Sequence, residues 1–306
     1  MPHDPAFATF PRRFLLATAT ALTLLGSAHA DTPLPVTASF SILGDLVRVV
    51  GGERVAVTSL VGPNEDAHVF EPTPGHAKTV LANKLLVTNG LGFEPWAHKL
   101  VKSAGYRGPV LVASKGVRPR SLADEHGHTE ADPHAWQNPQ NVILYVRNIA
   151  TGLAHADPAG AGSYQANAEA YVKELQALDT WAQAQIASIP AAKRKVITSH
   201  DAFGYFGAHY GIQFLAPQGI STEAEPSAKQ VAQLIRQIQR EKIRAVFLEN
   251  MGSPKLIAQL SKDAGATLGP TLYADALSAA DQPDATTYLQ MMRYNVTHLV
   301  TGMRLN

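Results

Sequence analysis

Three histidines and one aspartate of this 306-residue sequence stand in settings that suit metal binding, although they lie far apart along the chain. These residues are His68, His134, His200 and Asp275. Imidazole nitrogens and carboxylate oxygens bind divalent first-row metals, and three nitrogens with one oxygen fit the tetrahedral coordination of zinc. We therefore predict that the fold brings the four side chains to one metal ion. Zinc is the expected metal, and manganese or iron(II) is the alternative.

The local sequence around each residue favours this interpretation. His200 and Asp275 directly follow predicted strands, and His68 and His134 lie in loops that contain proline. Loops at the carboxyl ends of parallel strands are where α/β sheets bind ligands. Each residue taken alone has an ordinary alternative, because a loop histidine is usually a surface residue and an aspartate after a strand often caps a helix. The metal site is predicted from the four residues together.

Other histidines and carboxylates are secondary candidates. His126 and His128 lie in the polar stretch 124–130, where we expect solvated loop residues, with a weak accessory metal site as the alternative. Partners for the ring N–H groups of the ligands are expected to be backbone carbonyls or carboxylates. The candidate carboxylates are Glu65, Asp66 and Asp201. A second set, expected to cap helices rather than border the site, is Glu223, Glu225 and Glu249.

Predicted strands and helices alternate twice along the chain. In the first half the strands span 36–40, 55–61, 85–88 and 110–113, and the helices span 42–50, 75–83 and 94–103. In the second half the strands span 195–198, 212–215, 245–248, 267–273 and 298–301, and the helices span 202–210, 227–241, 254–264 and 285–296. This alternation predicts an α/β fold with two lobes, 31–156 and 190–306, each a parallel sheet flanked by helices.

One long helix is predicted between the lobes, over residues 157–189. Asp157 and Pro158 form a favourable helix start, and apolar residues then recur at intervals of three and four until Ile189, just before Pro190. At about 1.5 Å per residue, a helix of about thirty residues is roughly 45 Å long, more than one small domain needs. We interpret it as a rigid connection that permits little hinge motion, with a long core helix as the alternative.

Residues 1–30 predict an export signal that is removed. Arg12 and Arg13 precede an apolar stretch at 14–26, and Ala28 and Ala30 form a small-residue cleavage site. A retained N-terminal anchor is the alternative. We therefore expect the mature chain to be a soluble periplasmic protein.

Composition narrows the chemistry and the partners. The sequence contains no cysteine, so a metal must be held by nitrogen and oxygen, and no cysteine follows the signal to carry a lipid. After removal of the predicted signal, 24 basic and 24 acidic residues remain. This balance argues against nucleic acid as a partner.

The segments around the four residues resemble the solute-binding proteins of metal-specific ABC importers, the zinc- and manganese-binding group called cluster A-I. The resemblance extends over nearly the whole mature region. The segments that carry it are Glu65-Asp66-Ala67-His68 with Glu71-Pro72-Thr73-Pro74, Asp132-Pro133-His134-Ala135-Trp136, Thr198-Ser199-His200-Asp201-Ala202-Phe203, residues 219–227, and Asp275 with Leu277-Ser278. It implies two lobes joined by one long helix, a metal buried in the cleft between them, and an inner-membrane ABC permease as partner. We expect a monomer.

The resemblance also informs the choice of metal. Manganese binders of this group tend to use two histidines and two carboxylates, whereas this chain has His200 at the third position, and imidazole favours zinc over manganese. Zinc binders of the group often carry a long histidine-rich acidic loop before the second ligand. Here that stretch holds only His126 and His128 among acids, which puts a metal-collecting role for the loop in doubt.

Two rival functions follow from the same residues. Three histidines and a carboxylate could form a catalytic zinc site, but no HExxH helix is present and Asp275 fills the fourth position that a catalytic zinc leaves open. A protein that binds a metal chelate such as haem or a siderophore would not need four converging ligands. We therefore predict metal capture for transport, and not an enzyme.

Overall fold

The computed structural model describes residues 1, 3, 32–123 and 129–306. The predicted signal at 1–30 is almost wholly outside these residues, and so are His126 and His128. Residues Thr32–Asn306 form one folded unit, which is described below. Within the described residues, no helix has both the length and the apolar character that crossing a membrane requires.

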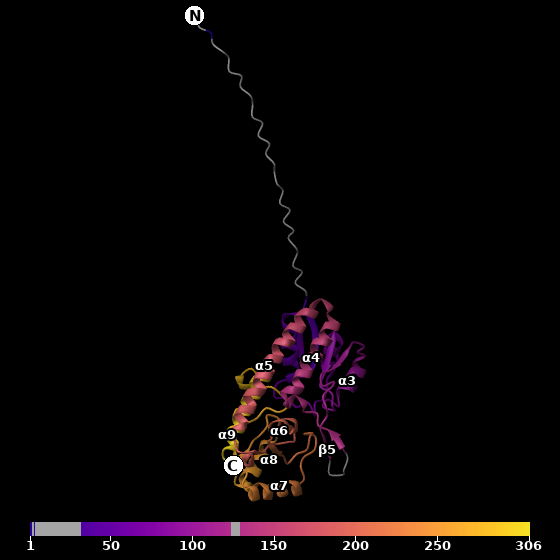
Figure 1. The fold of residues 1–306 in the computed structure, drawn as a ribbon. Coiled ribbons are helices and arrows are strands. Elements are labelled where there is room, and N and C mark those ends of the chain that lie inside the picture. The colour runs from indigo at the N-terminus through magenta and orange to yellow at the C-terminus, as the bar shows by residue number, and fades with distance from the viewer. Residues whose placement is uncertain (2, 4–31, 124–128) are drawn as a thin grey trace. The chain divides into compact units, whose positions relative to one another are not determined.

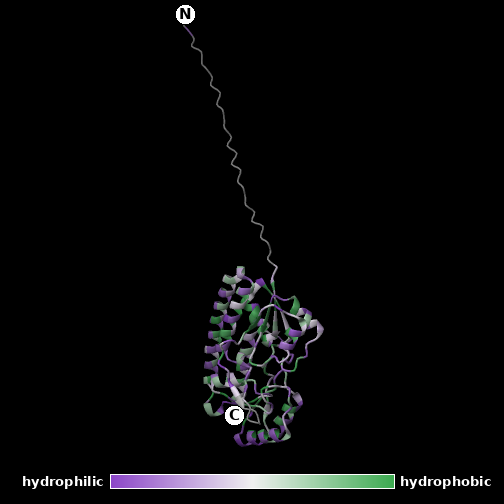
Figure 2. Ribbon diagram, turned by 90° about the vertical axis from the view of Figure 1, so that its right-hand side faces the viewer, coloured by the Kyte–Doolittle hydropathy of each residue, from purple (hydrophilic) through white to green (hydrophobic). Residues whose placement is uncertain are grey.

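The first half of this unit contains a parallel sheet in the order β2-β1-β3-β4. Its strands are β1 (Leu34–Phe40), β2 (Val55–Val61), β3 (Leu85–Thr88) and β4 (Val110–Val112). The accompanying helices are α1 (Ser41–Gly51), α2 (Pro74–Ala82) and α3 (Ala97–Ala104). Consecutive residues of β1 are buried from Val36 to Phe40, which means that both faces of the sheet are covered, as parallel sheets require. Figure 2 shows hydrophobic residues concentrated on these strands.

The second half repeats this arrangement with the order β10-β9-β7-β8. Its strands are β7 (Lys195–Ile197), β8 (Gln213–Leu215), β9 (Ala245–Val246) and β10 (Thr267–Leu268). The helices are α6 (Gly204–Tyr210), α7 (Ala228–Glu241) and α8 (Pro254–Ala264). In the first sheet β1 lies between β2 and β3, and in the second sheet β7 lies between β8 and β9. The strand order therefore reverses beside β1 and beside β7. The carboxyl ends of strands at such a reversal form the usual binding crevice of an α/β sheet.

Helix α5 (Ala161–Ala187) connects the two halves and passes both of them (Figure 1). Its 27 residues correspond to about 40 Å. It packs against α1 and α4 (Pro139–Ala156) of the first half and against α9 (Tyr288–Met303) of the second. The predicted start at Asp157 and Pro158 is a short 3₁₀ turn, Pro158–Gly160, directly before the helix.

Two predicted strands differ from the structure, and one pair of strands was not predicted. The predicted strand 298–301 is wrong: it lies inside α9, where Leu299 and Val300 are buried at helical spacing from Val296. The predicted strand 267–273 ends early, because Pro270 has no N–H for the ladder, and pairing resumes only at Leu272. A short hairpin, β5 (Ser121–Ala123) with β6 (Thr129–Ala131), was not predicted.

The segment after Leu272 leaves the second sheet and lies against the first half of the unit. Trp136 Nε1 and Gln137 Nε2 both donate to the carbonyl of Ala274, at 2.9 and 2.8 Å. Further along, the amide of Leu277 donates to Ser41 Oγ at 3.0 Å. Asp275 is therefore held by contacts with the first half although it follows the last strand of the second.

A buried carboxylate on α5 links helices from both halves. Asp179 accepts hydrogen bonds from Gln140 Nε2 of α4 at 2.7 Å and from Tyr210 OH of α6 at 2.9 Å. Its Oδ1 also lies 2.8 Å from Nε2 of His209. Burial alone would raise the pKa of Asp179, but the hydrogen bonds from Gln140, His209 and Tyr210 lower it below its usual value. The ionised carboxylate is therefore the form that the fold stabilises.

We predict that Asp179→Ala destabilises the folded unit by about 3 kcal/mol at pH 7, because the partners of the carboxylate lose charge-assisted hydrogen bonds in a buried setting. Urea unfolding followed by circular dichroism measures the change. Because folding lowers the pKa of Asp179, its contribution is present above the unfolded pKa and is lost as pH falls through the folded pKa. The difference from wild type should therefore shrink in acid.

The matched control for this prediction is Asp263→Ala. Asp263 is exposed on α8 and accepts a hydrogen bond only from Gln259 and, through its carbonyl, Gln239. Its replacement should change stability by less than about 0.5 kcal/mol. Equal effects of the two substitutions would show that Asp179 does not link the helices energetically.

Candidate metal centre

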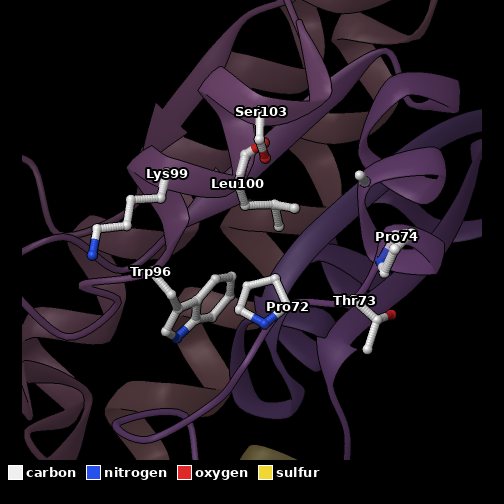
Figure 3. A pocket seen from close by; sticks show the side chains of 8 residues that line it. Pro72, Thr73, Pro74, Trp96, Lys99, Leu100 and Ser103 are labelled. Carbon is white, nitrogen blue, oxygen red and sulfur yellow. The ribbon is translucent and has the colours of Figure 1, made fainter.

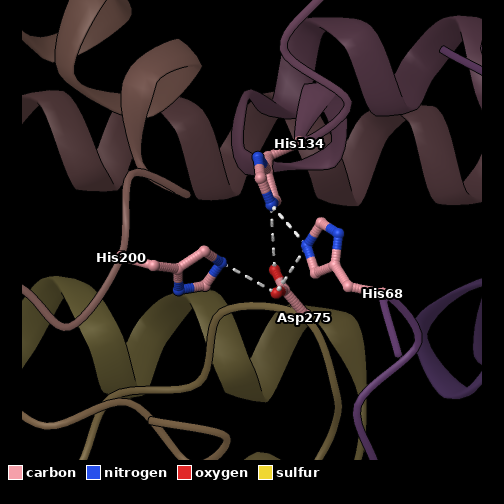
Figure 4. A group of neighbouring side chains, drawn as sticks. All are labelled: His68, His134, His200 and Asp275. Atoms are coloured by element: carbon pink, nitrogen blue, oxygen red, sulfur yellow. Dashed lines mark hydrogen bonds and ion pairs between the residues drawn. The ribbon is translucent and has the colours of Figure 1, made fainter. Parts of the chain in front are cut away.

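The four residues singled out in the sequence lie together in the structure. The candidate ligand atoms of His68, His134, His200 and Asp275 all lie within 4.8 Å of one another (Figure 4). All four residues are buried, with exposed fractions of 8%, 0%, 1% and 0% in that order. The predicted convergence is thus present in the geometry.

The spacing of the ligand atoms suits a small cation. His68 Nε2 lies 3.2 Å from His134 Nε2 and 3.4 Å from Asp275 Oδ2. The other Asp275 oxygen is 3.6 Å from His134 Nε2, and Oδ2 is 3.0 Å from His200 Nε2. Ligands about 2.0–2.1 Å from a tetrahedral zinc are about 3.3 Å apart. The side chains therefore surround a volume of the size that one such ion fills.

His68 is positioned by the loop that follows β2. Its backbone amide donates to Asp66 Oδ1 at 2.9 Å, which closes a tight turn before the histidine. The carbonyl of the preceding residue, Ala67, accepts from Trp96 Nε1 at 2.8 Å. The imidazole ring contacts the edge of Phe93, with 4.8 Å between centroids. The loop is thus fixed on both sides of the ligand.

His134 is held by the aspartate two residues before it. Asp132 Oδ1 accepts from the backbone amide of His134 at 3.0 Å and lies 2.9 Å from its Nδ1. The other oxygen of Asp132 pairs with Arg120 Nη1 at 3.3 Å. A Cβ on Gly204 would overlap the side-chain ends of Arg120 and Asp132, so a larger residue at this position would have to displace the pair. With Nδ1 bound to a carboxylate, Nε2 is directed at the other ligands.

His200 is held in the same way by a carboxylate from another strand. Glu249 Oε1 accepts from the amides of Ser199 and His200, at 2.7 and 3.1 Å. Its Oε2 is in direct contact with His200 Nδ1. Both carboxylates, Asp132 and Glu249, thus contact the main chain and the ring of the same histidine. This pairing orients the imidazole and increases its basicity as a ligand.

The carboxylates that contact the histidine rings are not the ones expected from the sequence. Glu249 was expected to cap a helix, but it is wholly buried and contacts His200. Of the expected carboxylates, Asp66 accepts from the backbone amide of His68 and from Thr222 Oγ1, and Glu65 accepts from the amide of Gly62. Glu249 follows β9, which lies beside β7 in the sheet, and only the strand order brings it to His200. For Asp132, its place two residues before His134 was a signal that could have been used.

Electrostatics couple the carboxylates and the imidazoles. Burial alone would lower the pKa of His200, but Glu249 and Asp275 raise it well above its usual value. Burial alone would raise the pKa of Asp275, but the neighbouring His200 and His134 lower it well below its usual value. In the metal-free protein the expected pair is therefore a protonated His200 with an ionised Asp275.

Several polar atoms at the centre lack hydrogen bonds. Both oxygens of Asp275 and Nε2 of His200 are buried and make no hydrogen bond of acceptable geometry with the described residues. Buried polar atoms are normally satisfied, and an exception indicates an ion or another missing partner. The donor set, the spacing and these atoms all fit a divalent transition metal. The rings of Phe93 and Trp136 pack against the ring of His134.

The other candidates have different roles. His209 pairs with Asp179, and His76 helps to cap α2, with its Nδ1 accepting from the amide of Thr73 at 3.0 Å. Glu223 and Glu225 are exposed on the loop before α7. Among the described residues, the group around Asp275 is the one whose side chains could hold a metal.

Comparisons with known proteins agree with this geometry. Residues 36–302 match the family described as zinc-uptake complex component A, periplasmic. The chain is 33% identical to the manganese-binding lipoprotein MntA of Halalkalibacterium halodurans over 91% of both chains. It is 32% identical to the iron-binding protein YfeA of Yersinia pestis, covering 87% of this chain and 85% of that one.

A solved structure shows the same fold. The periplasmic zinc-binding protein TroA of Treponema pallidum superimposes with a TM-score of 0.83 at 27% identity, covering 89% of this chain and 99% of that one. Proteins of this kind are binding components, not enzymes, and they work with membrane permease and ATPase components of ABC transporters. The chain therefore belongs to the family of zinc-uptake complex component A, the substrate-binding proteins of metal ABC transporters.

Proposed function

We propose that the protein captures zinc with His68, His134, His200 and Asp275 and delivers it to the permease of its ABC transporter. The observation that supports this proposal is the buried group of three imidazoles and one carboxylate, whose candidate ligand atoms all lie within 4.8 Å of one another and so are close enough to bind a single zinc ion. Zinc is the cargo of this site, bound for transport and then released.

The donor set is the reason for placing zinc before manganese. The three imidazole nitrogens are borderline donors, which favour zinc over manganese, whereas manganese prefers oxygen ligands such as carboxylates. Related proteins carry names that refer to manganese, iron and zinc, so the relatives divide between these metals. Because of these relatives, manganese or iron(II) is the second candidate for the bound metal.

We also infer how the chain is organised for this role. Residues 31–156 and 190–306 act as two lobes, and residues 157–189 connect them. Residues 1–30 act as an export signal, and the mature protein works in the periplasm as a soluble monomer that has no nucleic acid partner. The basic, apolar and small-residue regions of 1–30 and the balanced charge of the remainder support this assignment.

We predict that His200→Ala weakens zinc binding by about 1,000-fold or more, because a tetrahedral site loses one of its four ligands. Isothermal titration with zinc and then manganese measures the affinities and their order. The matched control is His155→Ala, which removes an exposed imidazole on α4 and should leave both affinities unchanged. An unchanged zinc affinity in His200→Ala would exclude the proposed ligand set, and tighter binding of manganese than of zinc in the wild type would exclude zinc as the preferred cargo.

We predict that zinc binding at pH 7 releases about one proton, because zinc must replace the proton on His200 Nε2. Because the pKa of His200 is raised in the metal-free protein, the affinity for zinc should fall as pH falls. The release of this proton should vanish only at a pH above the raised pKa. Titration calorimetry in buffers of different ionisation enthalpy counts the protons. Glu249→Gln removes the negative charge that faces His200 Nδ1 and should reduce the number of protons released, while equal release in both proteins would contradict the assignment.

We predict that protein recovered from the periplasm begins at Asp31, because Ala28 and Ala30 form the cleavage site. Intact-mass measurement of the protein from a bacterial expression host determines the N-terminus. An arginine substitution at Ala30 should block processing, while the same substitution at Thr32, beyond the site, should be processed to a greater extent. A mature mass that still includes Phe14 would show that the segment is a retained anchor.

A further inference from the structure

The four candidate ligands are not equally accessible. His68 is 8% exposed, whereas His134, His200 and Asp275 are 0–1% exposed. A cavity of about 540 Å³ lies on the outer side of His68, which lines it. Its other walls include Gly92, Glu130, Ala131, Ser221 and Glu223. Most of these residues are exposed, so the cavity runs from the surface to one ligand of the centre.

The walls of this cavity come from both halves of the folded unit. Gly92 and Ala131 belong to the first half, and Ser221 belongs to the loop before α7 in the second. Directly beside the cavity, Thr222 Oγ1 donates to Asp66 Oδ2 at 2.7 Å and so joins this loop to the turn that carries His68. The cavity is therefore present while the two halves are in contact. A metal ion could pass through it without separation of the two halves.

His68 is also held differently from the other two histidines. The Nδ1 atoms of His134 and His200 each face a buried carboxylate. Asp66, which precedes His68 by two residues, accepts from the backbone amide of His68 instead. Among the described residues, no carboxylate contacts Nδ1 of His68. Without that second attachment, the ring of His68 is freer to turn about its side-chain bonds than the other two rings.

We propose that metal passes to and from the centre through this cavity, and that His68 is the ligand that meets the metal first and releases it last. The proposal rests on the proposed function, since it assigns an order to the same four ligands. Glu130 and Glu223 place two carboxylates on the cavity wall, where their charge favours the approach of a cation. The more deeply buried His134, His200 and Asp275 complete the coordination after His68 has bound.

A substitution that fills the cavity tests the route. Ala131→Trp places an indole at the wall of the cavity without changing a candidate ligand. The association and dissociation rate constants for zinc should then fall together, by about tenfold, while Kd stays within about twofold. Stopped-flow transfer of zinc to and from a fluorescent chelator measures both. Ser221→Trp fills the same cavity from the opposite half and provides the test if Ala131→Trp does not fold.

The chain offers a matched control in a second cavity of about 450 Å³. That cavity is lined by Pro72, Trp96, Lys99, Leu100 and Ser103, among others, and does not include a candidate ligand (Figure 3). Ser103→Trp should leave both rate constants unchanged. Wild-type rates in Ala131→Trp and Ser221→Trp would overturn the route and indicate exchange by separation of the halves. Absence of zinc binding by the wild-type protein would instead refute the proposed function.

The order of the ligands is tested by comparing two ligand variants. If His68 meets the metal first, His68→Ala should lower the association rate constant by about tenfold and also raise the dissociation rate constant. His134→Ala removes a ligand that joins later, so its association rate constant should stay within about twofold of wild type while dissociation accelerates. The reverse pattern, with association slowed only in His134→Ala, would overturn the assignment of His68.

Discussion

A buried carboxylate surrounded by three imidazoles is the constraint on which the rest of this structure depends. Asp275 has no exposed surface, and the neighbouring imidazole rings stabilise its charge. An unpaired charge in such a place would cost several kcal/mol, and in the metal-free protein the raised pKa of His200 favours a proton on its ring beside Asp275. The two outer carboxylates, Asp132 and Glu249, fix the rings that make this exchange possible. If these residues bind the metal as proposed, a divalent cation displaces the proton of His200 and brings a larger positive charge to Asp275.

Both halves of the fold are arranged to deliver side chains to that position. His200 and Glu249 follow β7 and β9, which are neighbours where the strand order reverses, and His68 follows β2 in the other sheet. Helix α5 and the contacts of Asp179 fix the two halves relative to each other along one side. A geometry with ligand atoms 3.0–3.6 Å apart requires such rigidity, because small displacements would change the coordination of a metal.

The sequence alone predicted the alternation of strands and helices and the convergence of the four residues, because these follow from local patterns and from proline-containing loops. It did not predict the role of Glu249, since that depends on β9 lying beside β7, and strand order is not encoded in any local pattern. The misassigned strand at 298–301 has a similar cause. Leu299 and Val300 suit a strand locally, and only their packing with the rest of α9 makes the segment helical.

The placement of Asp275 has a consequence for how the polypeptide acquires its structure. The carbonyl of Ala274 is bound by Trp136 and Gln137, and the amide of Tyr288 donates to Asp45 Oδ2 on α1 at 2.8 Å. The N-terminal half therefore lacks partners for buried groups until almost the whole chain has been synthesised. A nascent chain of about half the length would therefore be poorly protected against unfolding.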